Sequence, residues 1–370
     1  MDLEKFLIEE FKYFHENPEL SFEEFETTAR LKKILSDYQI EILNLPLKTG
    51  LIAKIGAGNA KIALRTDIDA LPIKETANLT YKSKIPGKMH ACGHDFHMTA
   101  VLGAAIILKS LEKNLRGSVL IIFQPAEESA LGALKILETG ALKNISKIFG
   151  LHSSPLMEVG EIGISSGAIM ASVDKFEINF IGKTTHAAHP DKGIDTILIA
   201  ANFIMAAQSI ISRNLEPANA NLLSITHIEG GNTWNVIPEK IFLGGTIRSF
   251  SENDRNKIKS RVKILAEKIA ESFGGIADIK FIEGPPAVVN DKNLADFAKK
   301  IATEQNFKIQ AAPISLGGED FANYLKKICG MFLLIGTGLS ESNHNSNFRV
   351  DTAAIFPTAK FLAKLIENAL

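Results

Sequence analysis

A thiol and two imidazoles lie within six positions of the chain, at Cys92, His94 and His97, although 370 residues contain only two cysteines and nine histidines. A Cys-x-His pair combines soft and borderline ligands of the kind that zinc and similar divalent transition metals prefer. A buried free cysteine beside histidines that cap a helix produces the same short pattern. The segment therefore predicts a metal site only if further ligands come from other parts of the chain.

Candidate ligands also follow two stretches that are expected to be buried strands. The continuous apolar run 118–123 is typical of a parallel sheet, and Glu127 and Glu128 come shortly after it. The apolar stretch 145–151 leads to His152 in the same way. Because open α/β sheets bind ligands at the carboxyl ends of their strands, we expect these side chains at one edge.

Five side chains form the candidate ligand set, namely Cys92, His94, Glu128, His152 and His344. The set exceeds the four ligands of a closed tetrahedral zinc site. It suffices for two metals roughly 3.5–4 Å apart, which can hold a bridging hydroxide and polarise a carbonyl. Glu127 is left over beside a ligand, where it can take the proton of the water and pass it to a leaving amine nitrogen. The predicted reaction is amide hydrolysis.

The elements that position these residues follow from apolar spacing. Leu3 to Phe14 has helical periodicity, and Ser21-Phe22-Glu23-Glu24 resembles a capping box that opens a second helix. Residues 51–55 and 61–65 are expected strands, and 98–111 is apolar on most faces, as in a helix inside an α/β layer. Asp67 and Asp69 come just past the second strand. They either form a turn or point into a site, and their position does not separate these alternatives.

The pattern changes near residue 167. A strand at 173–180, a helix at 195–212, strands at 221–229 and 240–250, a helix at 254–273 and a strand at 276–282 are expected. This β-α-β-β-α-β order is the ferredoxin-like unit. The predicted fold is therefore a two-domain α/β protein. Residues 1–170 and 283–370 form a catalytic domain with a mixed, mostly parallel sheet flanked by helices, and 171–282 form an inserted ferredoxin-like α+β domain.

Composition excludes several classes of protein. Lys and Arg number 41 against 42 Asp and Glu, so the formal net charge of −1 provides no basic field for nucleic acid and no polybasic run for a membrane surface. The first residues do not resemble a secretory signal, and no apolar run is expected to reach the roughly 20 residues of a membrane span. Two cysteines suit a reducing compartment. We expect a cytoplasmic enzyme with a small-molecule substrate.

Short motifs occur along nearly the whole sequence. They are His15-Glu16-Asn17-Pro18-Glu19-Leu20, Arg65-Thr66-Asp67-Ile68-Asp69-Ala70-Leu71-Pro72, Met89-His90-Ala91-Cys92-Gly93-His94-Asp95, Phe123-Gln124-Pro125-Ala126-Glu127-Glu128, Gly150-Leu151-His152, His186-Ala187-Ala188, Asn235-Val236-Ile237-Pro238, Gly245-Thr246-Ile247-Arg248 and Gly318-Glu319-Asp320-Phe321. With these motifs the chain resembles the metal-dependent amidohydrolase and peptidase family that contains aminoacylases, hippurate hydrolase and the plant auxin-conjugate hydrolases. Cys-Gly-His-Asp followed by Pro-Ala-Glu-Glu is the most specific part of the resemblance.

The resemblance implies that the five candidate ligands bind two divalent ions (Zn, Mn, Co or Ni), with Glu127 as general base and acid. It implies that substrates are N-acyl amino acids such as N-acetyl or N-benzoyl conjugates. It also implies that the inserted domain is a lid through which a homodimer forms. His186 would bind the substrate or the oxyanion, and Asn235 and Arg248 would meet the substrate's carboxylate or carbonyl.

Some residues depart from the family pattern or keep a structural interpretation. The family has Leu-His where this chain has Asn343-His344, so the last ligand is assigned by position more than by motif. Asp67 and Asp69 are expected to orient the ligands from behind. His97, like His90 and His189, is expected to cap or pack.

Three rival hypotheses remain. A dipeptidase or carboxypeptidase could use the same scaffold. A thiol hydrolase could use Cys92 as nucleophile and His94 as base, although residues one position apart seldom reach that geometry. A non-catalytic role, in which metals only hold the fold or act as a sensor, is disfavoured because neither Glu127 nor a ligand is missing.

Overall fold

The computed structural model describes residues 2–370, which divide into two compact units. The first contains the chain up to Ile169 together with Val289–Pro313 and Asp320–Leu370, and the second contains Met170–Val288 and Ile314–Glu319. Met170 and residues 283–288 and 314–319 were expected in the first domain but belong to the second unit. The chain therefore passes between the units more often than a single insertion requires.

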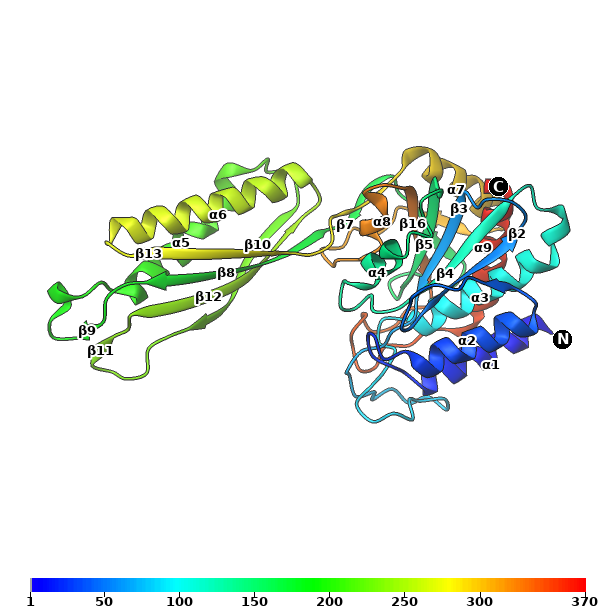
Figure 1. Ribbon diagram of the computed structural model, residues 1–370, viewed down its shortest axis with the longest axis horizontal. Helices are drawn as coiled ribbons and strands as arrows, with labels where there is room; N and C mark the ends of the chain where they lie inside the picture. Colours follow the sequence, from blue (N-terminus) through cyan, green and yellow to red (C-terminus); the bar gives the residue numbers. More distant parts are fainter. Residues whose placement is uncertain (1) are drawn as a thin grey trace. The chain divides into compact units, whose positions relative to one another are not determined.

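The first unit is built on a mixed sheet with the strand order β1-β2-β4-β3-β5-β16-β6-β15. Figure 1 labels β2, β3, β4, β5 and β16 of this sheet. Its central strands β4, β3, β5 and β16 run parallel, whereas β1, β2 and β6 pair antiparallel to a neighbour. The strands are β1 (Glu41–Ile42), β2 (Leu51–Gly56), β3 (Ile62–Asp67), β4 (Ser118–Gln124), β5 (Lys147–Ser154), β6 (Glu161–Gly163), β15 (Lys308–Gln310) and β16 (Cys329–Gly336). The predicted mostly parallel α/β sheet is confirmed, and its parallel centre places several strand ends together.

Helices cover this sheet. They are α1 (Leu3–Glu16), α2 (Phe25–Asp37), α3 (His94–Ser110), α4 (Gly132–Glu138), α7 (Lys292–Glu304), α8 (Ala322–Leu325) and α9 (Ile355–Ala369). The almost fully buried α3 packs between α1 and α9. A Cβ added at Gly103 of α3 would lie 2.6 Å from Leu7 Cδ1 and 2.8 Å from the Cβ of Ala359. This close approach anchors α3, whose N-terminus carries His94.

The start of α2 differs from the predicted capping box. The helix begins at Phe25, and its N-cap, Glu24, makes no side-chain cap hydrogen bond. The Ser21 hydroxyl instead donates to Asp69 Oδ2 over 2.7 Å. The Glu19 carboxylate takes over the capping role and accepts the N–H groups of Glu26 and Thr27. The capping-box interpretation was wrong because its two expected partners, Ser21 and Glu24, form long-range hydrogen bonds with Asp69 and Ala126 instead.

The second unit has a four-stranded antiparallel sheet in the order β10-β12-β8-β13. It comprises β8 (Ser172–Ile181), α5 (Thr196–Asn214), β10 (Asn221–Glu229), β12 (Lys240–Ser249), α6 (Glu252–Ser272) and β13 (Ile276–Glu283). Both helices pack on the sheet around a core that includes Phe176, Phe180 and Phe203 (Figure 1). The β-α-β-β-α-β order agrees with the sequence pattern. The short strands β9 (Thr185–His186) and β11 (Val236–Ile237) pair at one tip of the unit, and β7 (Gly167–Met170) pairs with β14 (Val288–Asn290).

Helix α5 corrects the expectation that no apolar run approaches the length of a membrane span. Its 19 residues have a mean hydropathy of 1.4 over the best window, so by length and composition alone it could cross a membrane. One third of that window is buried, where Ile199, Phe203 and Ile210 pack on the sheet. Packing against β strands thus explains part of its apolar composition, but Met205 remains 75% exposed.

Candidate metal centre

The predicted ligands come from four places in the first unit. Cys92 lies in the turn before α3, and His94 is the first residue of that helix. His152 lies near the end of β5, Glu128 follows β4, and His344 lies in the loop after β16. Gly93 permits the sharp turn into α3, because it has φ +84° and an added Cβ would lie 2.5 Å from Ser153 Oγ.

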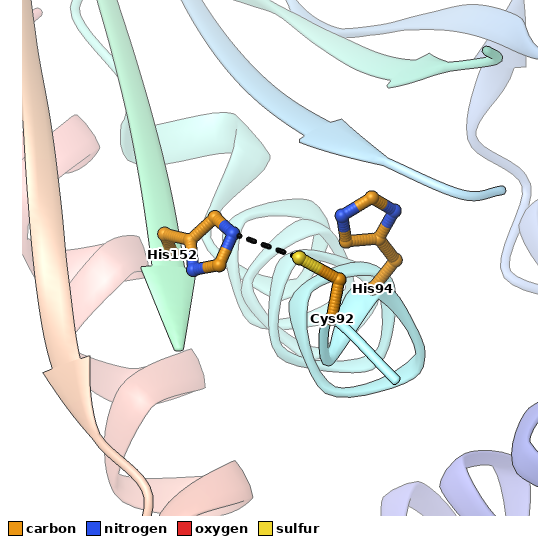
Figure 2. Close-up of side chains that lie close together, drawn as sticks. All are labelled: Cys92, His94 and His152. Carbon is orange, nitrogen blue, oxygen red and sulfur yellow. Dashed lines mark hydrogen bonds between the residues drawn. The ribbon is translucent and has the colours of Figure 1, made fainter. Parts of the chain in front are cut away.

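The first cluster contains Cys92, His94 and His152 (Figure 2). One ligand atom from each lies within 4.8 Å of the others, and Cys92 Sγ is 3.4 Å from His152 Nε2. His152 is oriented because its Nδ1 donates to the carbonyl of Ser153 over 2.8 Å. This hydrogen bond leaves the Nε2 lone pair directed at the thiol.

The second cluster contains Cys92, Glu128 and His344, again within 4.8 Å. His344 Nε2 is 3.4 Å from Glu128 Oε1. His344 has an unusual φ of +67°, and its backbone N–H donates to the carbonyl of Ala91. The neighbouring Asn343 donates from Nδ2 to the carbonyl of Cys92 over 3.2 Å. The Asn that replaces the family's Leu therefore ties the His344 loop to the Cys92 turn.

The atoms of these clusters suit cations. His94 donates from Nδ1 to the carbonyl of Asp69 over 2.8 Å, which leaves Nε2 as the electron-pair donor. That buried Nε2 has no hydrogen-bond partner within residues 2–370 and lies 3.9 Å from Glu128 Oε1. A buried polar atom without a partner is costly, and a bound cation removes the cost. Two ligand groups that share Cys92 match a pair of ions.

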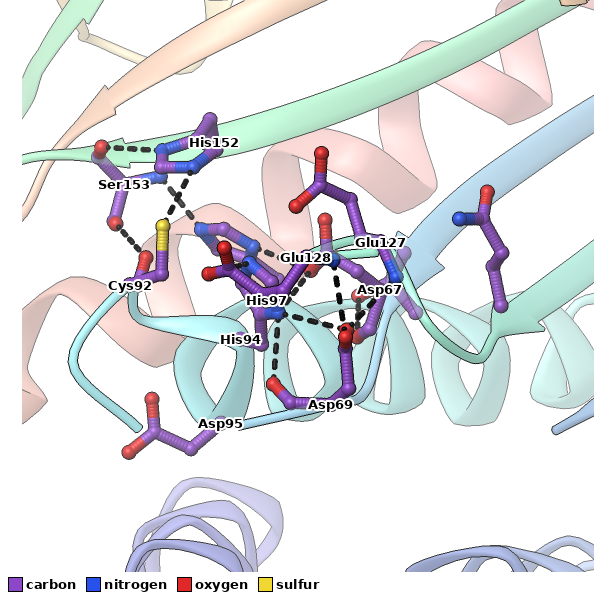
Figure 3. Close-up of polar contacts among 12 residues, drawn as sticks. Asp67, Asp69, Cys92, His94, Asp95, His97, Glu127, Glu128, His152 and Ser153 are labelled. Atoms are coloured by element: carbon purple, nitrogen blue, oxygen red, sulfur yellow. Dashed lines mark hydrogen bonds and ion pairs between the residues drawn. The ribbon is translucent and has the colours of Figure 1, made fainter. Parts of the chain in front are cut away.

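Asp67 and His97 orient the candidate ligands through hydrogen bonds and packing (Figure 3). His97 Nδ1 donates to Asp67 Oδ1 over 2.7 Å, and its Nε2 accepts the N–H of Ser153. The His97 ring also packs on His152, with centroids 4.7 Å apart. Burial alone would raise the pKa of Asp67, but the imidazoles of His94 and His97 and the guanidinium of Arg65 hold this pKa well below its usual range. His97, expected only to cap or pack, orients the end of β5. Its i,i+3 spacing from His94 was the available signal.

Asp69 holds the loop that carries the two glutamates (Figure 3). Its Oδ1 accepts the N–H of Glu127 over 3.1 Å, and its Oδ2 accepts the N–H of Glu128 over 3.0 Å. Of the two alternatives that the sequence left open, these contacts favour the second, because the Asp69 carboxylate points toward the candidate site. The side chains of Glu127, Glu128 and His94 form another group within 4.8 Å. Glu127 Oε1 accepts the N–H of Asp320 over 3.3 Å.

A fully buried guanidinium connects several of these carboxylates. Arg65 donates to Asp67 over 2.6 Å, to Asp320 over 2.8 Å and to the side chain of Gln124 over 2.9 Å. Asp320 also accepts from the Gln124 side chain and from the N–H of Ala133. Burial raises the pKa of Asp320 to about 6, although Arg65 and these donors oppose the rise. Arg65 was predicted only as part of a strand and of a motif, because a single arginine in a β-strand does not indicate which distant carboxylates it contacts.

The predicted substrate-binding residues all lie in the second unit. His186 and Asn235 are neighbours across the pair β9 and β11, where the N–H of Ala187 donates to the carbonyl of Asn235. His186 is exposed, and its Nδ1 accepts the N–H of Ala188. Arg248 lies near the opposite end of β12 and pairs with Leu222 and Val173. The structure thus groups two of these three residues and separates the third.

A group of cation ligands beyond the ends of parallel strands, of which Cys92 and His94 are buried and His344 is exposed, has another carboxylate beside it, and metal-dependent hydrolases use this arrangement. Comparison with known proteins leads to the same class. Residues 63–368 match the Peptidase family M20/M25/M40. The chain belongs to this family, and it is a metal-dependent hydrolase of amide bonds.

Similar proteins add detail. The chain is 44% identical to the N-acetyl-L-cysteine deacetylase of Bacillus subtilis (strain 168), over 100% of this chain and 89% of the relative. It is 39% identical to IAA-amino acid hydrolase ILR1-like 5 of Arabidopsis thaliana, over 96% and 85%. The solved structure of the YXEP protein of Bacillus subtilis, described as a dinuclear metal binding peptidase, matches with a TM-score of 0.91 and 40% identity over 100% and 98%. Together with the ligand clusters, this relative supports two divalent ions in this chain.

Proposed function

We propose that this enzyme hydrolyses the amide bond of N-acyl amino acids to a carboxylic acid and a free amino acid. The observation that carries the proposal is the pair of ligand groups that share Cys92, with Glu127 beside them. The relatives named as a deacetylase of N-acetylcysteine and as a hydrolase of IAA-amino acids support this substrate class. Both names describe the removal of an acyl group from an amino acid.

The proposed ligands of the two ions are Cys92, His94, Glu128, His152 and His344, with Cys92 common to both groups. Zinc, manganese, cobalt and nickel all suit this set of thiolate, imidazole and carboxylate. Held by these residues, the ions would polarise the scissile carbonyl as Lewis acids and would lower the pKa of a bound water molecule. Asp67 and Asp69 keep the imidazoles and the glutamate loop in the geometry that this chemistry requires.

Glu127 is the proposed proton carrier. Its carboxylate takes a proton from the attacking water and then donates it to the amine nitrogen as the C–N bond breaks. The N–H of Asp320 donates to Glu127 Oε1 and so limits the orientations of this carboxylate. Because Asp69 holds the amides of both glutamates, Glu127 stays beside the ligand Glu128 while it remains available for proton transfer.

Substrate binding is assigned to His186, Asn235 and Arg248 of the proposed lid. An imidazole can donate to the oxyanion, and a guanidinium can clamp a carboxylate with two parallel hydrogen bonds. His186 and Asn235 precede Lys240, the first residue of β12, whereas Arg248 is eight residues further along that strand. At the rise of a β-strand the eight residues from Lys240 to Arg248 span about 26 Å. His186 and Asn235 lie at the β9 and β11 tip (Figure 1), so the three side chains are too far apart for one small ligand. A homodimer resolves the difficulty if each site takes His186 and Asn235 from one chain and Arg248 from the other.

The proposed dimer surface comprises α5 and β10 of the second unit. Ile197, Leu198 and Met205 of α5 are 51%, 47% and 75% exposed. Strand β10 is at an edge of its sheet, so its outer backbone groups can pair with another strand. A contiguous apolar helix beside a sheet edge favours a second copy of the chain. We place the enzyme in the cytoplasm because Cys92 and Cys329 are both free thiols.

A dipeptidase or carboxypeptidase is the second candidate, since the solved relative is described as a peptidase. The thiol-hydrolase alternative is disfavoured by the surroundings of Cys92. Burial raises the pKa of its thiol well above the usual range, which opposes a free thiolate nucleophile. Metal ligation gives that buried sulfur a better role, because a cation favours the thiolate.

Metal analysis coupled to a substrate panel tests the proposal. The purified protein is stripped with a chelator, reloaded with Zn, Mn, Co or Ni, and assayed on N-acetyl and N-benzoyl amino acids and on dipeptides. We expect close to two ions per chain, loss of turnover on chelation, and recovery on acyl amino acids that exceeds recovery on dipeptides. Activity of the stripped protein that alkylation abolishes would establish the thiol mechanism instead. Preference for dipeptides would establish the peptidase.

A further inference from the structure

The loop after β4, residues 125–131, holds both Glu127 and Glu128, and it is fixed through its backbone. Two of its amides donate to Asp69, as described above. The preceding amide, that of Ala126, donates to Glu24 Oε1 over 2.8 Å. Three successive N–H groups are therefore held by two buried carboxylates. Glu24 comes from the start of α2, an element that contributes no other group to the candidate metal centre.

Ala126 has a backbone conformation that must be enforced. Its φ of +55° lies in the left-handed region, which residues with a Cβ seldom adopt. Its carbonyl accepts the N–H of Gly132 over 3.1 Å and the hydroxyl of Ser129 over 3.0 Å, which closes the loop. A return to negative φ would rotate the peptide planes that follow and redirect the side chains of Glu127 and Glu128. The hydrogen bond from Ala126 to Glu24 opposes this rotation.

A carboxyl group at the position of Glu24 is energetically unfavourable. The Glu24 side chain is 0% exposed, and its Oε2 has no hydrogen-bond partner within the described part of the chain. Burial of an incompletely paired carboxyl destabilises a fold unless the group has another use. Burial also raises the pKa of Glu24, although the Thr49 hydroxyl and the backbone N–H groups of Glu24 and Ala126 oppose the rise, so the ionised form is disfavoured at this position. A helix start does not require it either, because it makes no side-chain cap bond and Glu19 binds the first free amides of α2.

We infer that Glu24 is a positioning residue for the reaction, which acts through the amide of Ala126 to hold Glu127 and Glu128 in place. The inference rests on the proposed function for its kinetic consequence but not for its structural one. The essential property of Glu24 is a hydrogen-bond acceptor oxygen at the reach of its side chain from α2. Its negative charge is not essential. This distinction separates the effects of three substitutions.

The experiment compares Glu24→Gln, Glu24→Asp and Glu24→Leu in the metal-loaded enzyme. Glutamine keeps an acceptor oxygen at the same reach, so kcat should stay within about threefold of the original enzyme. Aspartate keeps the charge but is one methylene too short, and leucine has no acceptor. For both we expect kcat to fall on the order of 100-fold, because small displacements of reacting groups have effects of that size. KM should change by less than about threefold, since the substrate-binding groups are elsewhere.

Hydrogen exchange supplies a readout that needs no activity. The amides of 126–128 should exchange slowly in the original protein and in Glu24→Gln, and quickly in the aspartate and leucine variants. Binding of the probe ion Co²⁺, followed by visible absorption, should weaken in the same two variants because Glu128 is in this loop. If the original enzyme hydrolyses no acyl amino acid, the proposed function fails, whereas exchange and Co²⁺ binding still decide the role of Glu24.

Glu19→Leu is the matched control. It removes another carboxylate that accepts two amides at the start of α2, without touching the loop. It should leave exchange at 126–128 and kcat nearly unchanged. The inference is overturned if this control reproduces the losses, if Glu24→Gln is as impaired as Glu24→Leu, or if the aspartate variant keeps both turnover and slow exchange. Should the leucine variant fail to fold, the contrast between glutamine and aspartate decides.

Discussion

Adjacent glutamates in this chain have different surroundings, and the difference suits different tasks. Glu128 Oε1 lies 3.9 Å and 3.4 Å from the Nε2 atoms of His94 and His344. Glu127 instead has one oxygen at the N–H of Asp320. A carboxylate surrounded by imidazoles suits a cation, and one held by a backbone donor suits proton transfer. The pair therefore allows a test in which each residue controls for the other.

We expect Glu127→Gln to retain the metal ions and to lose turnover by about 10²–10⁴-fold, because glutamine cannot take a proton from water. Glu128→Gln should lose both metal and turnover, because a neutral amide is a poor ligand for these ions. Metal content by elemental analysis and kcat on an acyl amino acid measure the two effects. Full turnover in Glu127→Gln would remove the proposed mechanism.

At the scale of elements, the parallel strands β3, β4 and β5 end together, and their buried polar groups need partners. Arg65 of β3 meets this need by donating to both Asp67 and Asp320. Asp67 in turn orients His97, and the backbone N–H of Asp320 reaches Glu127. One guanidinium thus supports two sides of the candidate site, and its loss would leave buried carboxylates unpaired.

Arg65→Met should lower the free energy of unfolding by about 3–5 kcal/mol and reduce metal affinity, since removing one partner of a buried ion pair has costs of this size. Denaturant unfolding and metal titration measure these effects. Arg255→Met is the matched control, because Arg255 forms a similar buried pair with Asp174 in the second unit. It should destabilise the protein but leave metal content unchanged. Equal loss of metal in both variants would contradict the specific role of Arg65.

Helix α1 is joined to the start of α3 by a buried histidine. His15 Nδ1 is 2.6 Å from Asp95 Oδ2, and its Nε2 is 3.3 Å from Glu75 Oε1. Burial alone would lower the pKa of His15, but the hydrogen bonds and charges of Asp95 and Glu75 outweigh it and raise this pKa to about 9. This buried ionic contact therefore lies directly beside the turn that carries Cys92 and His94.

The raised pKa of His15 predicts a dependence of stability on pH. The folded protein holds this proton more tightly than the unfolded chain, so the stabilisation is complete below about pH 6.5 and is lost as pH rises through about 9. The loss amounts to roughly 3 kcal/mol for a shift of this size. Unfolding free energies of the original protein and of His15→Gln, measured across this range, should converge at alkaline pH. A constant difference between them would show that His15 does not titrate in this window.

At the scale of the whole molecule, the residues proposed to bind substrate cannot all serve one site of a single chain. His186 and Asn235 lie together at the tip formed by β9 and β11, and Arg248 lies near the other end of β12. The exposed apolar residues of α5 and the edge strand β10 provide a surface for a second copy. The proposed homodimer with composite sites would account for both features.

Mixing two inactive variants tests this arrangement. His186→Ala and Arg248→Ala should each lose most turnover as homodimers. After the two are unfolded and refolded together, half of the dimers are mixed, and one of their two sites receives neither substitution. About a quarter of the original activity should return. No recovery in mixed dimers confirmed by mass would show that each site uses a single chain.

Much of this architecture follows from local patterns in the sequence. The strands around residues 51–55 and 118–123 and the whole β-α-β-β-α-β order were predictable, because apolar periodicity records which face of an element is buried. The short strands β1, β6 and β15 were not, since two or three residues carry too little periodicity. The apparent capping box at Ser21 failed because Asp69, 48 positions away, takes its hydroxyl.

The residues of the candidate site likewise fall into those that local sequence patterns predicted and those that only the structure revealed. The sequence alone determined which side chains have the chemistry of ligands and proton carriers, because Cys92, His94, Glu127 and Glu128 stand in short motifs. Tertiary structure decided that Glu24, Arg65, His97 and Asp320 support them, through single contacts between residues far apart along the chain. Such contacts leave no periodic signal, since each depends on where the folded backbone brings one donor to one acceptor. Short sequence motifs thus determine which kinds of atoms are available at the candidate metal centre, and the tertiary fold determines their positions.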